Sequence, residues 1–171
     1  MITRSHTLGD APSTAVYSTC ERYRYSLTRI WNTDGPRVAF VMLNPSTATE
    51  MQNDPTIHRC EQRARTLGFG GFCAVNIFAL RATDPRVMRA ADDPEGPDNP
   101  PALMQAATWA DMLIAAWGVH GTHKDQGPIC EAHLRAAGHT LHHLGLTKDG
   151  HPRHPLYLPY RAQPAIWTME K

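Results

Sequence analysis

Two amides, an indole and an imidazole stand near the ends of strand-like segments: Asn44, Asn76, Trp117 and His154. A buried amide on an apolar strand costs on the order of several kcal/mol unless it finds hydrogen-bond partners. Asn76 is therefore either a satisfied core amide or a group that reads the polar edge of a ligand. Asn44 precedes Pro45, and Asn-Pro is a common turn signal, so a turn former is the alternative to a site residue there.

The ten histidines and four cysteines form no metal-binding pattern. The cysteines lie far apart without a C-x-x-C pair, which favours buried free thiols. His120-x-x-His123 does not have the spacing of a helical ligand pair, and no Glu or Cys completes a tetrahedral set. We expect neither a metal nor a cofactor.

Charge and hydropathy limit the partners. Seventeen Lys and Arg against sixteen Asp and Glu give a net charge of +1, and the pI is near 7.8. A domain held on nucleic acid by bulk charge usually has a pI above ~9, so only a local basic rim remains open. No segment approaches the ~18 apolar residues of a membrane span, and residues 1–6 lack the apolar core of a secretory signal. We expect a cytoplasmic protein with no membrane partner.

Apolar patterning predicts strands that alternate with helices. The predicted strands are 23–31, 37–43, 72–78, 112–117 and, less clearly patterned, 139–144. The predicted helices are 55–67 with Asp54 as its cap, 101–110 with Asn99 as its cap, and 128–137. Residues 1–20 are expected to be a loosely packed segment, 84–101 and 119–127 to be loops, and the proline-rich tail excludes long regular elements.

This alternation indicates a single α/β domain, residues 1–171, with a mostly parallel sheet. Ligands of such sheets bind outside the carboxyl ends of the strands. We therefore expect Asn44, Asn76 and His154 to line one pocket at that edge.

Several ordered motifs resemble the family known as domain of unknown function 1643. They are Met42–Ala48, Asn53–Thr56, Arg59-Cys60, Asn76–Phe78, Ala116–Gly118 and His154–Tyr157. The resemblance covers the chain from about Cys20 to Trp167 and implies no particular activity.

The order of four motifs is also similar to that of the uracil-DNA glycosylase superfamily. The motifs are Asn44-Pro45, Asn76 with Arg81 shortly after it, Trp117-Gly118, and His154-Pro155 followed by Leu158. This resemblance implies a three-layer α/β/α sandwich with a small, mostly parallel central sheet.

The same resemblance implies roles for individual residues. Asn44 would position an attacking water, and a neutral His154 would donate to a carbonyl of the departing base. Asn76 would pair with the edge of a flipped base. Further substrate contacts would come from Pro45, Ser46, Phe78, Trp117 and Gly118. Either Phe40 or Phe78 would stack on the face of the base.

A basic rim and an apolar wedge would hold the DNA. The expected rim is Arg81, Lys148, Arg153 and Arg161. The expected wedge is Leu158, unless residues 156–158 simply pack the loop on the sheet. Leu156 replaces the small Ser that approaches a phosphate in the resembling enzymes, and Ser46 and Thr47 also depart from their pattern, which puts the grip on the DNA backbone in doubt.

Three functions remain open. The first is a glycosylase-like protein that recognises a nucleobase and hydrolyses its N-glycosidic bond, in DNA rather than RNA. The second is an enzyme that acts on a free nucleotide, nucleoside or modified base. The third is a non-catalytic module that binds nucleic acid or another partner.

Overall fold

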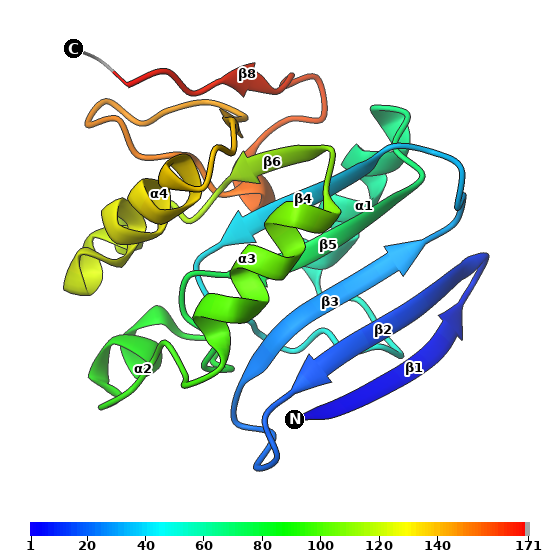
Figure 1. Ribbon diagram of the computed structural model, residues 1–171, viewed down its shortest axis with the longest axis horizontal. Helices are drawn as coiled ribbons and strands as arrows, with labels where there is room; N and C mark the ends of the chain where they lie inside the picture. The colour runs from blue at the N-terminus through cyan, green and yellow to red at the C-terminus, as the bar shows by residue number, and fades with distance from the viewer. Residues whose placement is uncertain (170–171) are drawn as a thin grey trace.

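The computed structural model describes residues 1–169 and places helices on both faces of one mixed sheet (Figure 1). Within this range the strands are β1 (Ile2–Leu8), β2 (Ala11–Tyr17), β3 (Arg24–Ile30), β4 (Arg37–Met42), β5 (Gly71–Asn76), β6 (Met112–Ala115), β7 (Leu141–His143) and β8 (Ala165–Ile166). The helices are α1 (Pro55–Thr66), α2 (Pro85–Ala90), α3 (Asn99–Trp109) and α4 (Gln126–Ala136), with 3-10 turns at Val119–Asp125 and Pro155–Tyr157. The predicted α/β class is confirmed.

The sheet is mixed, and the prediction of a mostly parallel sheet is wrong. Its order is β1-β2-β3-β5-β4-β6-β7-β8. The pairs β5–β4, β4–β6 and β6–β7 are parallel, whereas β1–β2, β2–β3, β3–β5 and β7–β8 are antiparallel. Helical crossovers join the parallel strands. Short turns join β1, β2 and β3, and because a short turn reverses the direction of the chain, these strands pair antiparallel.

The N-terminal segment is part of the sheet, contrary to the expectation for residues 1–20. It forms the hairpin of β1 and β2, and every second residue of β2 from Ala11 to Tyr17 is buried. The hydroxyl of Tyr17 donates to the Glu50 carboxylate at 2.8 Å. Small residues occupy most of these buried positions, so the alternation carries little hydrophobic signal.

Two further elements differ from the prediction. The segment predicted to be a loop at 84–101 contains α2, which begins after Asp84, whose carboxylate accepts from the Arg86 amide. Asn99 lies inside α3 rather than at its cap. Its side-chain amide donates to the backbone carbonyls of Asn76 (2.8 Å) and Ile77 (3.3 Å), so it joins α3 to the end of β5.

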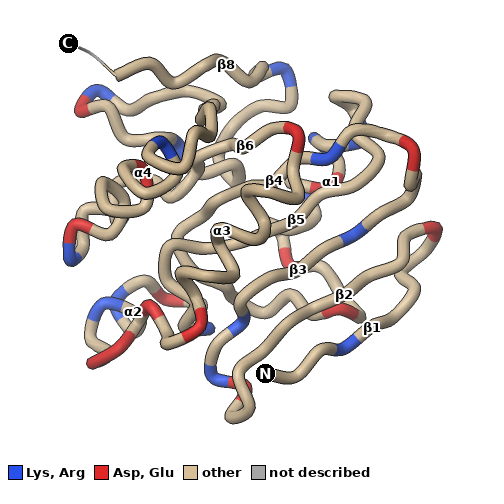
Figure 2. Tube along the Cα trace, viewed as in Figure 1, with Lys and Arg blue, Asp and Glu red and all other residues tan. Residues whose placement is uncertain are grey.

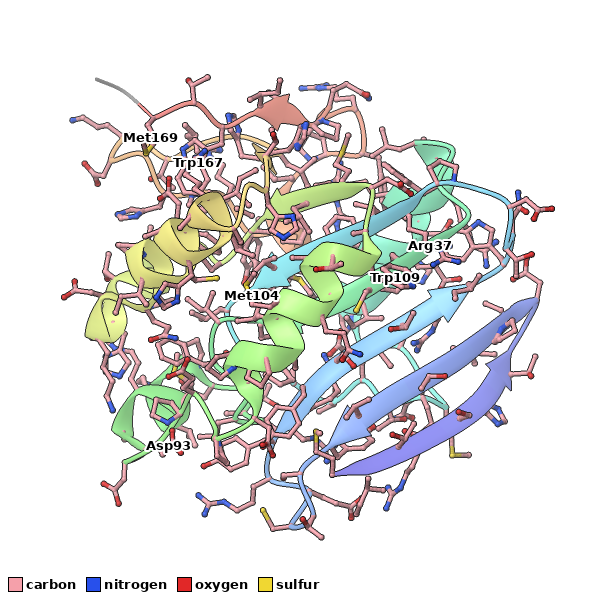
Figure 3. The ribbon with its side chains drawn as sticks, in the orientation of Figure 1. Arg37, Asp93, Met104, Trp109, Trp167 and Met169 are labelled. Atoms are coloured by element: carbon pink, nitrogen blue, oxygen red, sulfur yellow. The ribbon has the colours of Figure 1, made fainter. Side chains whose placement is uncertain are left out.

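Apolar side chains cover the central strands on both faces. Helix α1 packs on one face through Ile57, Cys60 and Ala64, and α3 and α4 pack on the other (Figure 1). At the carboxyl end of α3, the ring of Trp109 lies 5.1 Å from the Arg37 guanidinium carbon. Figure 3 labels both side chains. No helix within residues 1–169 is long and apolar enough to span a membrane.

Helix α1 also holds the C-terminal loop, which we define as residues 154–162. The Arg59 guanidinium donates to the carbonyls of Pro155 and Leu158. Arg63 is 1% exposed and donates to the carbonyls of Leu158 (3.3 Å), Pro159 (3.2 Å) and Ala162 (3.1 Å). Hydrogen bonds from a charged donor are stronger than neutral ones, so they can fix a loop that lacks a strand partner. Burial lowers the pKa of Arg63.

We predict that Arg63→Met destabilises the fold. The substitution keeps the side-chain length but leaves several carbonyls without their donor, which should lower the free energy of unfolding by roughly 3 kcal/mol in urea titrations. Arg161→Met, at an exposed position of the same loop, is the matched control and should change stability by no more than ~0.5 kcal/mol. Equal stability of the two variants would contradict the anchoring role of Arg63.

Candidate functional site

A cavity of about 650 Å³ lies at the carboxyl ends of β4 and β6. The loop after β4 leads to α1 on one face of the sheet, and the loop after β6 leads to α4 on the other (Figure 1). Neighbouring strands whose connections leave to opposite faces open a crevice between their loops, and open α/β sheets bind ligands there. The topology thus singles out this cavity as the candidate site.

Seven predicted site residues line the cavity: Asn44, Ser46, Trp117, Gly118, Arg153, His154 and Leu158. The lining does not include Pro45, Asn76, Phe78, Arg81, Lys148 or Arg161. Residues from three distant parts of the sequence therefore meet here, two loops of the sheet and the C-terminal loop.

Asn44 presents one free polar atom to the cavity. Its Nδ2 donates to the carbonyls of Pro45 (3.2 Å), Leu80 (3.3 Å) and Ala82 (2.8 Å). Three carbonyl acceptors require the nitrogen on that side and fix the orientation of the amide. Oδ1 has no partner among the described residues and is left as a hydrogen-bond acceptor.

His154 presents the complementary donor. Its Nδ1 accepts from the Leu156 amide at 3.3 Å, so in the neutral ring the proton lies on Nε2. Burial lowers the pKa of His154 to about 4, and the nearby carboxylate of Asp54 offsets this only in part. At neutral pH the imidazole is therefore an uncharged Nε2–H donor.

Glycines allow close packing on the Trp117 ring and a close approach of the end of β6 to the segment before His154. A Cβ at Gly121 would lie 2.2 Å from the Trp117 ring, and one at Gly127 would lie 2.7 Å from it. Gly118 has φ +70° and ψ −168°, a conformation nearly confined to glycine. Its N–H donates to the carbonyl of Pro152 at 2.8 Å, which ties the end of β6 to the segment before His154.

The β4–α1 loop, residues 43–54, is held from beneath by two buried arginines of β3. Arg24 donates to the carbonyl of Ala48 at 2.7 Å, and burial lowers its pKa to about 10. Arg29 donates to the carbonyl of Thr49 at 3.0 Å and to Asn53 Oδ1 at 2.7 Å. These contacts fix the path of the chain beyond Asn44.

Asp54 and Tyr157 line the cavity and were missed as site residues. Asp54 is buried, and its carboxylate accepts from the amides of Ile57 (2.8 Å) and Ala48 (3.1 Å). The sequence identified it only as a helix cap, which is a local signal. The Tyr157 side chain is 83% exposed at the cavity, and an irregular loop has no periodicity from which this exposure could be predicted.

Asn76 and the phenylalanines lie away from the cavity. Asn76 is 1% exposed, its backbone carbonyl accepts from Asn99, and its Oδ1 has no partner among the described residues. Phe78 is fully buried against the ring of His123, at 5.7 Å, and Phe40 is fully buried in the α1-side core. The expectation that Asn76 shares the pocket with Asn44 and His154 is wrong, because its side chain is enclosed within the sheet layer.

Leu158 does not project as a wedge, and most of the expected rim is absent from the cavity. Leu158 is 7% exposed and packs in the α1-side core, so the loop-packing alternative is correct. Of the rim residues only Arg153 lines the cavity; the Arg81 guanidinium lies 5.3 Å from the ring of Tyr17. Figure 2 shows basic and acidic residues interspersed along the chain.

The groups that line the cavity suit a neutral polar ligand. Its polar lining includes an acceptor at Asn44, an uncharged donor at His154, the Asp54 carboxylate and the Arg153 guanidinium. No group of three His, Cys, Asp or Glu side chains within residues 1–169 has the arrangement of a metal site. Such a cavity suits a planar ring that carries both a carbonyl and a donor.

We predict that the His154 imidazole titrates near pH 4. An unfolded histidine titrates near ~6.5, so between these values the unfolded chain binds the extra proton and the contribution of His154 to stability falls as the pH falls. Proton NMR should place the midpoint of the His154 ring resonance near 4, with His154→Gln identifying the signal. A midpoint near ~6.5 would show that the ring is not desolvated.

A family model described as "Protein of unknown function (DUF1643)" matches residues 24–156. The matched segment begins with β3, contains the strands that carry the cavity, and ends in the turn after His154. No curated protein and no solved structure matches the chain. Because the match covers more than half of the chain, this protein belongs to the DUF1643 family.

Proposed function

We propose that the cavity binds a nucleobase and that the chain hydrolyses the N-glycosidic bond of that base in DNA, in the manner of the uracil-DNA glycosylase superfamily. The observation that carries the proposal is the uncharged donor of His154 and the single free acceptor of Asn44 on one cavity. The proposal includes the three-layer α/β/α fold of that superfamily. The helices that pack on both faces of the parallel strands support this part of it.

The proposed reaction needs a stabilised leaving group and a positioned water. As the bond between the sugar and the base breaks, its electron pair goes to the base and the sugar acquires oxocarbenium character. The Nε2–H of His154 donates to a carbonyl of the base, where negative charge develops, and a neutral donor does this without a bound counter-ion. Water held by Oδ1 of Asn44 adds its oxygen to the sugar, and its proton passes through solvent to the base. An amide is not a base, so slow turnover is expected.

A free nucleoside or nucleotide is the second candidate substrate. It is favoured by the single basic residue, Arg153, that lines the cavity. A duplex-binding surface would require several cations to neutralise phosphates. The same two groups, Asn44 and His154, would then act on a small molecule.

The test is a base-release assay on oligonucleotides and on free nucleosides that carry uracil, deaminated or alkylated bases. We predict that His154→Ala lowers kcat on the responding substrate about 10²- to 10³-fold while KM changes little, because the donor acts mainly in the transition state. His6→Ala, on the exposed strand β1, is the matched control and should retain full activity. Release of no base from any substrate, or equal turnover of the two variants, would overturn the proposal.

A further inference from the structure

Tyr157 is an exposed aromatic side chain on the lining of the cavity. It is 83% exposed, more than any other large apolar side chain within residues 1–169. Val119, which also lines the cavity, is 50% exposed. Apolar surface concentrated at the opening of a cavity indicates that a partner covers it.

The backbone beneath Tyr157 is held on both sides. Before it, His154 Nδ1 accepts from the Leu156 amide, and Arg59 donates to the carbonyl of Pro155. After it, Leu158 is buried and its carbonyl accepts from both Arg59 and Arg63. A free ring on a fixed backbone loses little conformational entropy when a flat ligand stacks on it.

The charges at the cavity favour stacking over phosphate contacts as the source of affinity. Arg153 is the one Lys or Arg among the lining residues, and its Nε donates to the carbonyl of Leu146. Leu158 is in the core and cannot open a duplex as a wedge. Stacking of bases on aromatic side chains requires no net charge and operates on unpaired strands.

We propose that the ligand of this site is single-stranded DNA, with the target base in the cavity, the neighbouring base stacked on Tyr157 and a phosphate between them on Arg153. This inference rests on the proposed function and names its substrate. It separates the two candidate substrates, because a free nucleoside has no second base to occupy Tyr157. It also accounts for the low net charge, since one phosphate contact needs one cation.

The experiment measures fluorescence anisotropy with a labelled single strand that carries one deoxyuridine or deoxyinosine. The matching duplex and the free nucleosides are competitors. The wild-type protein should bind the strand more tightly than either competitor. Tyr157→Ala should weaken strand binding about tenfold, Tyr157→Phe should keep most of it, and Ile166→Ala, an exposed apolar position on β8, should leave it unchanged. Thermal unfolding of each variant confirms that it is folded.

Salt dependence tests the role of Arg153 separately. The logarithm of the binding constant should fall with the logarithm of salt concentration with a slope that Arg153→Gln reduces by about 0.7, one phosphate on a single strand. Equal binding of the strand by Tyr157→Ala and Tyr157→Phe, or tighter binding of the duplex than of the strand, would overturn this inference. If base release is still observed in the preceding assay, the proposed function stands. Absence of both strand binding and base release would overturn both.

Discussion

The site depends on arginines of the core that bind backbone carbonyls of loops. Arg59 and Arg63 of α1 hold the C-terminal loop through hydrogen bonds to backbone carbonyls. These carbonyls are uncharged, so they do not neutralise the two guanidinium groups. Burying a guanidinium costs free energy, visible in the lowered pKa of Arg63, and several charge-assisted hydrogen bonds offset that cost only when α1 and the loop are both in place. The position of the C-terminal loop, and with it that of His154, therefore depends on α1.

Arg24 and Arg29 bind backbone carbonyls in the same way at a second loop of the site. Lying on β3, they bind the β4–α1 loop and fix the chain that follows Asn44. The two loops are thereby aligned by rigid elements rather than by each other. Hydrogen bonds to the backbone then determine what Asn44 and His154 can offer a ligand. Each side chain uses one polar atom in a hydrogen bond to the backbone, and its other polar atom remains available.

The sequence predicts the parts of this fold that depend on local patterns. Continuous apolar runs identify the parallel strands β4, β5 and β6, and Asp54-Pro55 marks the start of α1. It does not predict strand order, because β3 pairs on its second edge with β5 rather than with β4, the next strand along the chain. That pairing depends on contacts between distant segments. The sequence also cannot distinguish Leu158 from Tyr157, since an irregular loop has no period that tells buried from exposed positions. Asn76 is a polar residue of the kind found in binding sites, but its side chain is buried in the core, which its residue type does not reveal.

The central claim is that Asn44 and His154 converge on a nucleobase in the cavity at the ends of β4 and β6. A crystal structure of the protein with a bound nucleobase tests this most directly. We expect a base within the cavity, with a carbonyl oxygen at hydrogen-bond distance from His154 Nε2 and a water molecule on Asn44 Oδ1. A base bound outside this cavity, or a His154 ring whose Nε2 faces away from the ligand, would contradict it.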